Sequence, residues 1–189
     1  MTSEQPTDPR EEIIEHLQAL RAFALNLTRN GASADDLVQD TLLKAWTKFD
    51  LYRPGTNLRA WLFTILRNTF YSKHRKRARE VADVEGQMAA RLATKPDHDG
   101  RLALADLATA FAKLPDEQRE VLVLVGAMGF SVEEAAETCG CAVGTVKSRA
   151  NRGRRALAEM LGLEQGEDMD LTESATMAVI SASHHPATG

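Results

Sequence analysis

The chain has 189 residues and a mass of 20.7 kDa, enough for one ordinary domain or two small ones. Hydrophobic residues make up 43% of it and the formal net charge is −4, which argues against global disorder and against a general attraction to nucleic acid. No run approaches the roughly 18 apolar residues of a membrane span, and the polar, acidic N-terminus does not resemble a secretory signal. We therefore expect a soluble cytoplasmic protein that does not insert into a membrane.

The two cysteines, Cys139 and Cys141, are separated only by Gly140 and cannot form a disulfide framework. A bond between them would close a strained ring, so we expect reduced thiols, as in a cytoplasm. His74 and His98 are too far away in sequence to complete a four-ligand site with them. We expect no metal and no cofactor.

Helical periodicity dominates the chain, and no segment alternates polar and apolar residues as a strand would. The sequence therefore predicts an all-α fold of two small helical domains joined by a flexible linker. Asp8 and Pro9 are a plausible cap and first-turn pair for the first helix, which is expected to end at Gly31.

In the second helix, Ser33 and Asp36 approximate a capping box at its start. Its apolar stripe is expected to comprise Leu37, Val38, Leu42, Ala45, Trp46 and Phe49. Its opposite face carries Asp35, Asp36, Gln39, Asp40 and Lys44. Phosphate would repel these acids, and no nucleophile or phosphate-binding loop accompanies them, so a basic protein partner is favoured over catalysis. An ordinary solvated face is the alternative.

A turn containing Pro54 and Gly55 precedes the third helix, which Asn57 is expected to cap. Trp61 is spaced as a core residue of this helix, and the apolar stripe stops near Phe70. A basic run then continues to Arg79, so the end of the helix is expected to project into solvent. Exposed aromatic and cationic groups can hold single-stranded bases and phosphates, although a charged helix end is the simpler explanation.

The apolar pattern weakens after the third helix, which predicts the domain division. We expect a first domain over residues 10–80, a linker over 81–100 with a short helix near Met88 to Leu92, and a second domain over 101–162. Residues 163–189 are expected to form an acidic, disordered tail. This tail is either a solvated extension or a shield over the basic helix of the second domain.

The second domain is expected to contain a helix-turn-helix. Ser131 and Glu134 predict a capping box for a short helix through Glu137, and Gly140 allows a left-handed turn residue before a final helix from about 143 to 161. Its inward side would carry Val146, Ala150 and Leu157. Its outer side would carry the groups suited to a DNA major groove, namely Thr145, Lys147, Ser148, Arg149, Asn151, Arg152 and Arg154.

The sequence resembles the extracytoplasmic-function (ECF) group of bacterial RNA polymerase sigma factors in three segments. Residues 35–46 resemble region 2.2, residues 58–68 and the basic run resemble regions 2.3 and 2.4, and residues 114–121 with the helix-turn-helix resemble region 4. The resemblance implies a non-enzymatic subunit that binds core polymerase through the acidic face and reads the −35 element with the last helix. It also implies that the −10 element is held by Asn57, Arg59, Asn68, Tyr71, Lys73, His74, Arg75 and Lys76.

Residues 54–61 and 139–145 resemble most closely the EcfG-type general stress sigma factors of alphaproteobacteria. That resemblance implies a NepR-type anti-sigma partner, a PhyR-type partner-switching regulator and promoters with a GGAA-like −35 element. Two alternatives stay open. One is an autonomous helix-turn-helix regulator, and the other is a sigma-mimicking decoy that binds an anti-sigma protein.

Overall fold

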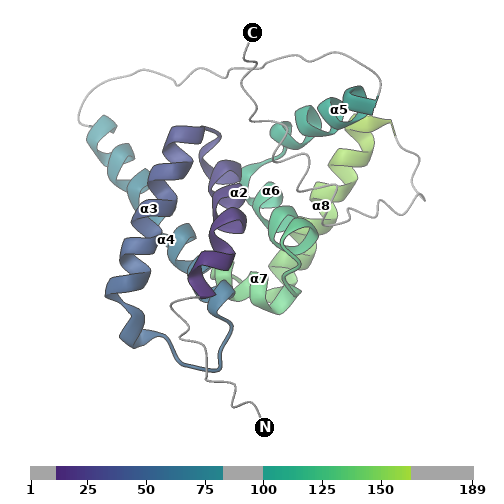
Figure 1. Cartoon of the computed structure of the whole chain (residues 1–189). Coiled ribbons are helices and arrows are strands. Elements are labelled where there is room, and N and C mark those ends of the chain that lie inside the picture. The colour runs from purple at the N-terminus through teal and green to yellow at the C-terminus, as the bar shows by residue number, and fades with distance from the viewer. Residues whose placement is uncertain (1–11, 83–99, 163–189) are drawn as a thin grey trace.

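The computed structural model describes residues 12–82 and 100–162, and these residues form helices without any strand (Figure 1). The predicted all-α fold is therefore confirmed for the described residues. The expected Asp8–Pro9 cap, the short linker helix and the acidic tail lie outside them. We call residues 12–82 the N-terminal half and residues 100–162 the C-terminal half.

The N-terminal half is built from three long helices and two short 3₁₀ turns: η1 (Ile13–His16), α2 (Leu17–Thr28), α3 (Gly31–Thr47), η2 (Phe49–Leu51) and α4 (Leu58–Ala82). Its core is formed where α2, α3 and α4 pack together. Leu20, Phe23, Leu62, Phe63 and Leu66 are fully buried there, and the rings of Phe23 and Phe63 stack with centroids 5.1 Å apart. The apolar spacing in the sequence thus builds this core directly.

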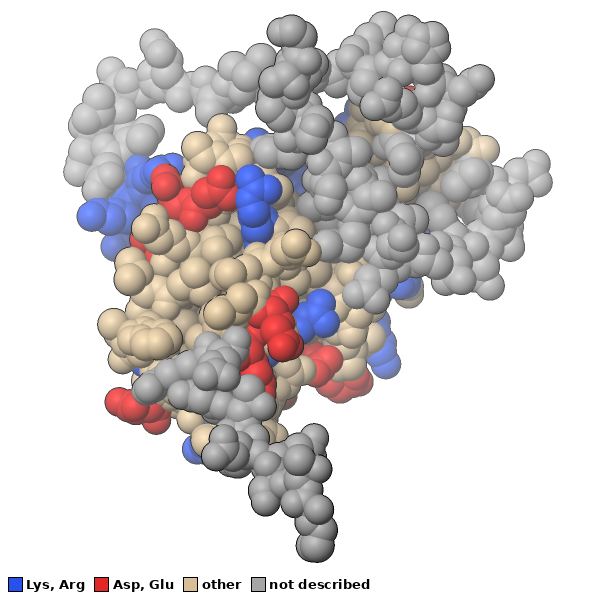
Figure 2. All heavy atoms as spheres, viewed as in Figure 1, with Lys and Arg blue, Asp and Glu red and all other residues tan. Residues whose placement is uncertain are grey.

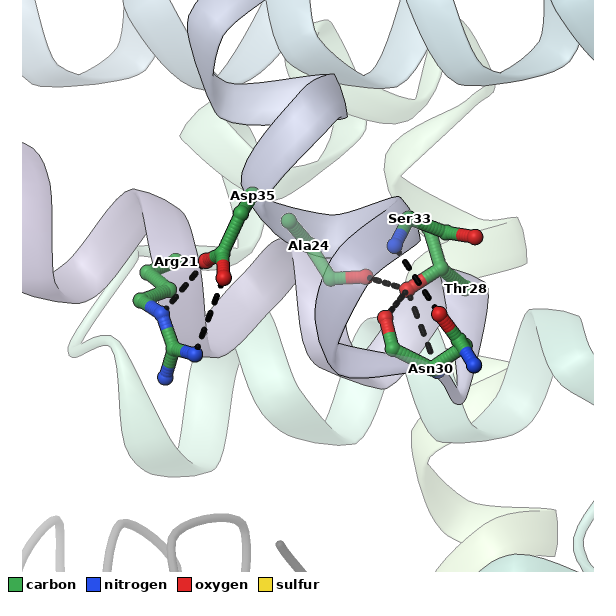
Figure 3. Close-up of polar contacts among 6 residues, drawn as sticks. All are labelled: Arg21, Ala24, Thr28, Asn30, Ser33 and Asp35. Atoms are coloured by element: carbon green, nitrogen blue, oxygen red, sulfur yellow. Dashed lines mark hydrogen bonds and ion pairs between the residues drawn. The ribbon is translucent and has the colours of Figure 1, made fainter.

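Two predictions at the junction of α2 and α3 are wrong. Arg29, with φ 54°, ends α2 in the left-handed conformation, and its amide donates to the Leu25 carbonyl. Asn30 caps α3 because its side chain accepts from the Ser33 amide at 2.9 Å (Figure 3). Gly31 is consequently the first residue of α3 rather than the end of the preceding helix, and Ser33 lies inside the helix instead of capping it.

The start of α4 follows the sequence prediction. The Asn57 side-chain oxygen accepts from the Ala60 amide at 3.0 Å, which confirms the predicted cap. Gly55 has φ 83°, as a left-handed turn residue requires. In the preceding turn, the ring of Tyr52 lies 5.3 Å from that of Trp61, and Trp61 is half-buried. Beyond Phe70 the described side chains from Ser72 to Arg79 are exposed.

The C-terminal half contains five helical elements: α5 (Gly100–Lys113), α6 (Asp116–Leu122), the π-helical turn η3 (Val123–Ala127), α7 (Val132–Cys139) and α8 (Val143–Leu161). The turn η3 continues α6 with wider hydrogen bonds, such as the one from the Met128 amide to the Val123 carbonyl at 2.9 Å. The sequence did not predict this change of helix type.

The helix-turn-helix has the predicted local structure. Both halves of the Ser131–Glu134 capping box are formed, and Gly140 adopts the left-handed conformation with φ 62° between α7 and α8. The predicted inward residues Val146, Ala150 and Leu157 are buried. The short helix extends to Cys139, slightly beyond the expected end.

Gly153 also faces inward, which the charge pattern of α8 did not suggest. It is buried against α6, and a Cβ atom at this position would lie 2.7 Å from Leu122 Cδ1. The absence of a side chain therefore allows α8 to lie close against α6. This contact sets how far the outer face of α8 stands from the body of the domain.

Candidate functional site

The outer face of α8 is a cationic and polar surface. Arg152 donates from Nε to the Ser148 carbonyl at 3.3 Å, one turn earlier in the same helix. The predicted residues that are exposed on this helix are Lys147, Ser148, Asn151, Arg152 and Arg154. Arg and Lys can bind guanine edges and phosphates, and Asn can bind adenine, so this surface has the chemistry of a major-groove reader.

Two predicted residues of α8 lie at the edge of this surface. The Arg149 side chain is only 20% exposed, and Nη2 lies 3.5 Å from Oε1 of Glu117 at the start of α6. Thr145 is half-buried in the first turn, where its carbonyl accepts from the Ser148 hydroxyl at 3.0 Å. Arg149 therefore already has an anionic neighbour within the protein.

The acidic face of α3 is partly neutralised by neighbouring helices. Asp35 accepts from Arg21 at 2.6 Å and 3.3 Å (Figure 3). Asp40 pairs with Lys73 of α4. Lys44 donates to the Thr69 hydroxyl at 3.1 Å, while the remaining predicted residues, Asp36 and Gln39, are exposed.

The same face of α3 also carries two large apolar residues, which were not expected there. Leu43 is 61% exposed and Trp46 is 62% exposed, so the prediction that Trp46 belongs to the buried stripe is wrong. With Asp36 and Gln39 these residues recur every three or four positions, which places them on one side of the helix. Exposed aromatic and aliphatic side chains beside acids are typical of a protein-binding surface.

The second half of α4 forms a strongly basic surface. Figure 2 shows Lys and Arg side chains gathered over the end of α4, at the upper left, with acidic side chains beside them. The predicted −10 residues that are exposed here are Asn68, Lys73, His74, Arg75 and Lys76.

The other predicted −10 residues face the C-terminal half instead. The Asn57 amide nitrogen lies 2.5 Å from Oε1 of Glu134, and the Arg59 guanidinium lies 5.1 Å from the centre of the Phe130 ring. The Tyr71 hydroxyl donates to Oε2 of Glu120 at 3.1 Å. The eight residues are thus divided between an open surface and the contact between the two halves.

Glu120 of α6 is the central group of that contact. Its side chain is fully buried, and its Oε1 accepts from Nε of Arg67 at 2.6 Å. Burial lowers the pKa of Arg67, but the negative charge of Glu120 and this hydrogen bond raise it further, so the net shift is upward. Burial and then the charge of Glu120 also raise the pKa of Tyr71. One feature of the sequence indicates that Glu120 is buried, because this acid directly precedes the apolar run 121–125.

A second polar contact joins α2 to α6. Asp116 Oδ1 accepts from Arg29 at 2.9 Å and from Arg119 at 2.8 Å. Arg119 is buried and also donates to the Asn26 side chain at 3.1 Å, while burial, followed by the nearby charge of Arg29, lowers its pKa. The two halves therefore pack against each other through α2 and α4 on one side and α6 and α7 on the other (Figure 1).

Both thiols are free in the described structure. Cys139 is buried, and burial followed by the charge of Glu120 raises its pKa to about 12, so the thiol stays protonated at neutral pH. Among residues 12–82 and 100–162, no three or more His, Cys, Asp or Glu side chains are grouped as metal ligands. No helix within these ranges is long and apolar enough to cross a membrane.

Comparison with protein families gives two matches that follow the two halves. Residues 13–80 match the family model of sigma-70 region 2, and residues 104–157 match that of sigma-70 region 4. The ECF RNA polymerase sigma factor EcfG of Rhodopseudomonas palustris (strain TIE-1) is 52% identical over 159 residues, which cover 84% of this chain and 88% of the relative.

Two solved structures are similar over most of the chain. One is the sigma factor RpoE in complex with the anti-sigma factor NepR from Bartonella quintana, with 50% identity, a TM-score of 0.73, and coverage of 85% of this chain and 100% of that one. The other is CnrH in complex with the cytosolic domain of CnrY, with 30% identity, a TM-score of 0.59, and coverage of 82% and 90%. With matches of this extent and identity in both halves, the chain belongs to the ECF RNA polymerase sigma factors.

Proposed function

We propose that this sigma factor directs core RNA polymerase to promoters of a general stress response under the control of a NepR-type anti-sigma factor. A PhyR-type regulator would release it by partner switching. The identity to EcfG and the similarity to RpoE bound to NepR support this assignment. The chain acts as a cytoplasmic, non-enzymatic specificity subunit, and the polymerase supplies the chemistry.

In this proposal the N-terminal half binds the polymerase through α3. The contacts come from Asp35, Asp36, Gln39, Asp40 and Lys44, and we add the apolar pair Leu43 and Trp46. Apolar anchors surrounded by charged residues give a protein interface its affinity, while the charges orient the partner. The exposure of both anchors, each above 60%, is the supporting observation.

Promoter DNA is held at two places. The −10 element is assigned to the eight residues predicted for it, seven on α4 and Asn57 at its cap, together with the turn before this helix. The −35 element, expected to be GGAA-like, is assigned to the outer face of α8 from Thr145 to Arg154. The observation that carries the assignment is the capped α7, the left-handed Gly140 and the cationic outer face of α8 in one helix-turn-helix.

We retain the predicted division of the chain as part of the proposal. Region 2 occupies residues 10–80, the linker 81–100, and region 4 residues 101–162, with an acidic tail over 163–189. The family matches at 13–80 and 104–157 support the assignment of region 2 and region 4. The linker would set the distance between the two DNA contacts.

The test is transcription in vitro with purified core polymerase and a promoter carrying a GGAA-type −35 element, compared with the same promoter after this element is scrambled. We expect initiation from the first template alone, and inhibition when a NepR-type protein is added. A gel shift without polymerase separates the main alternative, because an autonomous regulator would bind the duplex tightly by itself. Initiation that ignores the −35 sequence would refute the assignment of α8.

A further inference from the structure

The two halves of the protein meet on the helix that is proposed to hold the −10 strand. Arg59, Arg67 and Tyr71 all lie on α4, and Asn57 caps it. Each of these four residues contacts a residue of α6, α7 or the turn between η3 and α7. The contact between the halves and the DNA surface therefore share side chains.

The deepest of these contacts is made by a carboxylate. Glu120 accepts from Arg67 at 2.6 Å and from the Tyr71 hydroxyl at 3.1 Å, and its side chain has no exposed surface. A cationic guanidinium and a phenolic hydroxyl side by side are also a suitable site for a nucleic-acid phosphate. Glu120 gives these donors the kind of anionic acceptor that a phosphate would give them.

A second carboxylate occupies the beginning of α4. Glu134 accepts from the Asn57 side chain at 2.5 Å while its other oxygen accepts from the Ser131 amide at 2.8 Å. The capping box thus fixes the position of Glu134 before it meets the N-terminal half. Hydrogen bonds from Ser131 and then from Asn57 lower the pKa of this carboxyl, and the charge of the neighbouring Arg59 adds to the shift.

An aromatic contact completes the arrangement. The Phe130 ring packs 5.0 Å from the ring of Phe63 and lies 5.1 Å from the guanidinium of Arg59. Bases of single-stranded DNA are held by stacking on aromatic and guanidinium groups in the same manner. Phe130 is 5% exposed, so its ring occupies this position in place of any ligand.

We infer that Glu120, Glu134 and Phe130 act as an internal substitute for the −10 strand, two carboxylates replacing phosphates and one ring replacing a base. The free chain then withholds this surface until polymerase or promoter binding separates the halves. The inference rests on the proposed function, because it assigns the −10 strand to α4. It adds Arg67 to the residues that become available for DNA when the halves separate.

The physical character of the contact suits a reversible closure. A buried ion pair loses the hydration of both charges, so it stabilises the closed state less than its short distance suggests. Once the halves separate, Glu120 and Arg67 regain water and Arg67 can bind a phosphate. Removing the charge of Glu120 alone leaves Arg67 with a weaker partner and should favour opening.

The experiment uses the full chain with E120Q and a matched control, E159Q, which removes the same charge from an exposed position of the C-terminal half. Hydrogen exchange of α4 and α7 peptides reports opening. Fluorescence anisotropy with a labelled single-stranded −10 oligonucleotide, without polymerase, reports access to α4. Compared with E159Q, we expect E120Q to exchange about tenfold faster in these peptides and to bind the oligonucleotide about tenfold more tightly. This change is smaller than that expected when a whole partner of a buried ion pair is removed, because glutamine keeps the shape of the side chain.

Equal exchange and equal affinity in E120Q and E159Q would overturn the inference, and so would faster exchange without tighter binding. If circular dichroism shows that E120Q does not fold, R67Q removes the same ion pair from the other half. Faster exchange in R67Q would then support closure by this pair, and unchanged exchange would overturn it. Failure of the wild-type chain to direct polymerase to a promoter would instead refute the proposed function, while the exchange result would still test the closure.

Discussion

Replacing Gly153 with alanine adds a methyl group where α8 lies against α6. Its carbon would lie 2.7 Å from Leu122 Cδ1, 3.3 Å from Leu122 Cγ and 3.4 Å from Gln118 Cβ. Nonpolar carbons prefer separations of about 3.5–4.0 Å, so the first contact is far inside the repulsive range. Leu122 is 1% exposed, and its side chain cannot turn aside without displacing other core atoms.

Two opposing terms decide the size of the effect. Overpacking a core typically costs about 1–3 kcal/mol, whereas replacing glycine with alanine inside a helix gains up to about 1 kcal/mol. We therefore expect G153A to lower the free energy of unfolding by about 1 kcal/mol. The control is G144A in the same helix, where nothing lies within 4 Å of the added carbon and only the gain applies.

The assay is urea unfolding of the full chain, followed by circular dichroism, with wild type, G153A and G144A measured together. We expect G153A to be less stable than G144A by about 1–3 kcal/mol, because the helix propensity term is similar in both. The −35 affinity of G153A should also fall, since α8 must move away from α6. Equal stability of the two variants would refute the reasoning that Gly153 is required for this close approach.

Three further predictions concern the surfaces and the capping box. R152A should lose about 1–3 kcal/mol of discrimination between a GGAA-type and a scrambled −35 element. The control R155A removes an exposed cation outside the assigned set and should weaken binding to both sequences alike. Competition gel shifts with holoenzyme measure both effects. W46A should weaken binding to core polymerase by about 2 kcal/mol and should lower stability by less than this, because the side chain is 62% exposed. Native gel titration and thermal unfolding separate the two effects, and equal affinity for polymerase would exclude Trp46 as an anchor. The hydrogen bonds from Ser131, then the hydrogen bond from Asn57 and the charge of Arg59, lower the pKa of Glu134 from its ordinary value of 4.5. The contribution of Glu134 to stability is therefore present above pH 4.5 and is lost as the pH falls through the lowered pKa. E134Q should lose less stability than wild type in this acid range, measured by thermal unfolding against pH.

The helix-turn-helix shows how much local sequence can predict. Ser131, Glu134 and Gly140 act within a few residues of their own backbone, through a reciprocal cap and a left-handed turn. Val146, Ala150 and Leu157 follow the helical period and are buried. Interactions of this range depend little on the rest of the fold, so they were predicted correctly, as was the cap formed by Asn57.

Other features depended on choices that the sequence left open. Asn30 and Ser33 are both good cap residues, and in the structure Asn30 caps α3 directly after Arg29 ends α2. Trp46 fits the apolar spacing of α3, but α2 and α4 cover the sides of the helix that carry Leu37 and Ala45, and Trp46 stays exposed. A helical period gives the angle of a side chain around its helix and does not say how wide the covered sector is.

The sequence by itself determined the helical class, the turn geometry and the two concentrations of positive charge, because propensity, capping and periodicity act over a few residues. Tertiary structure alone decided that Glu120 of one half lies buried between Arg67 and Tyr71 of the other. These partners are separated by about fifty residues, and no local rule relates a carboxylate to a guanidinium at that distance along the chain. Packing of the two halves removes water from all three groups, and this loss of water makes their pairing necessary.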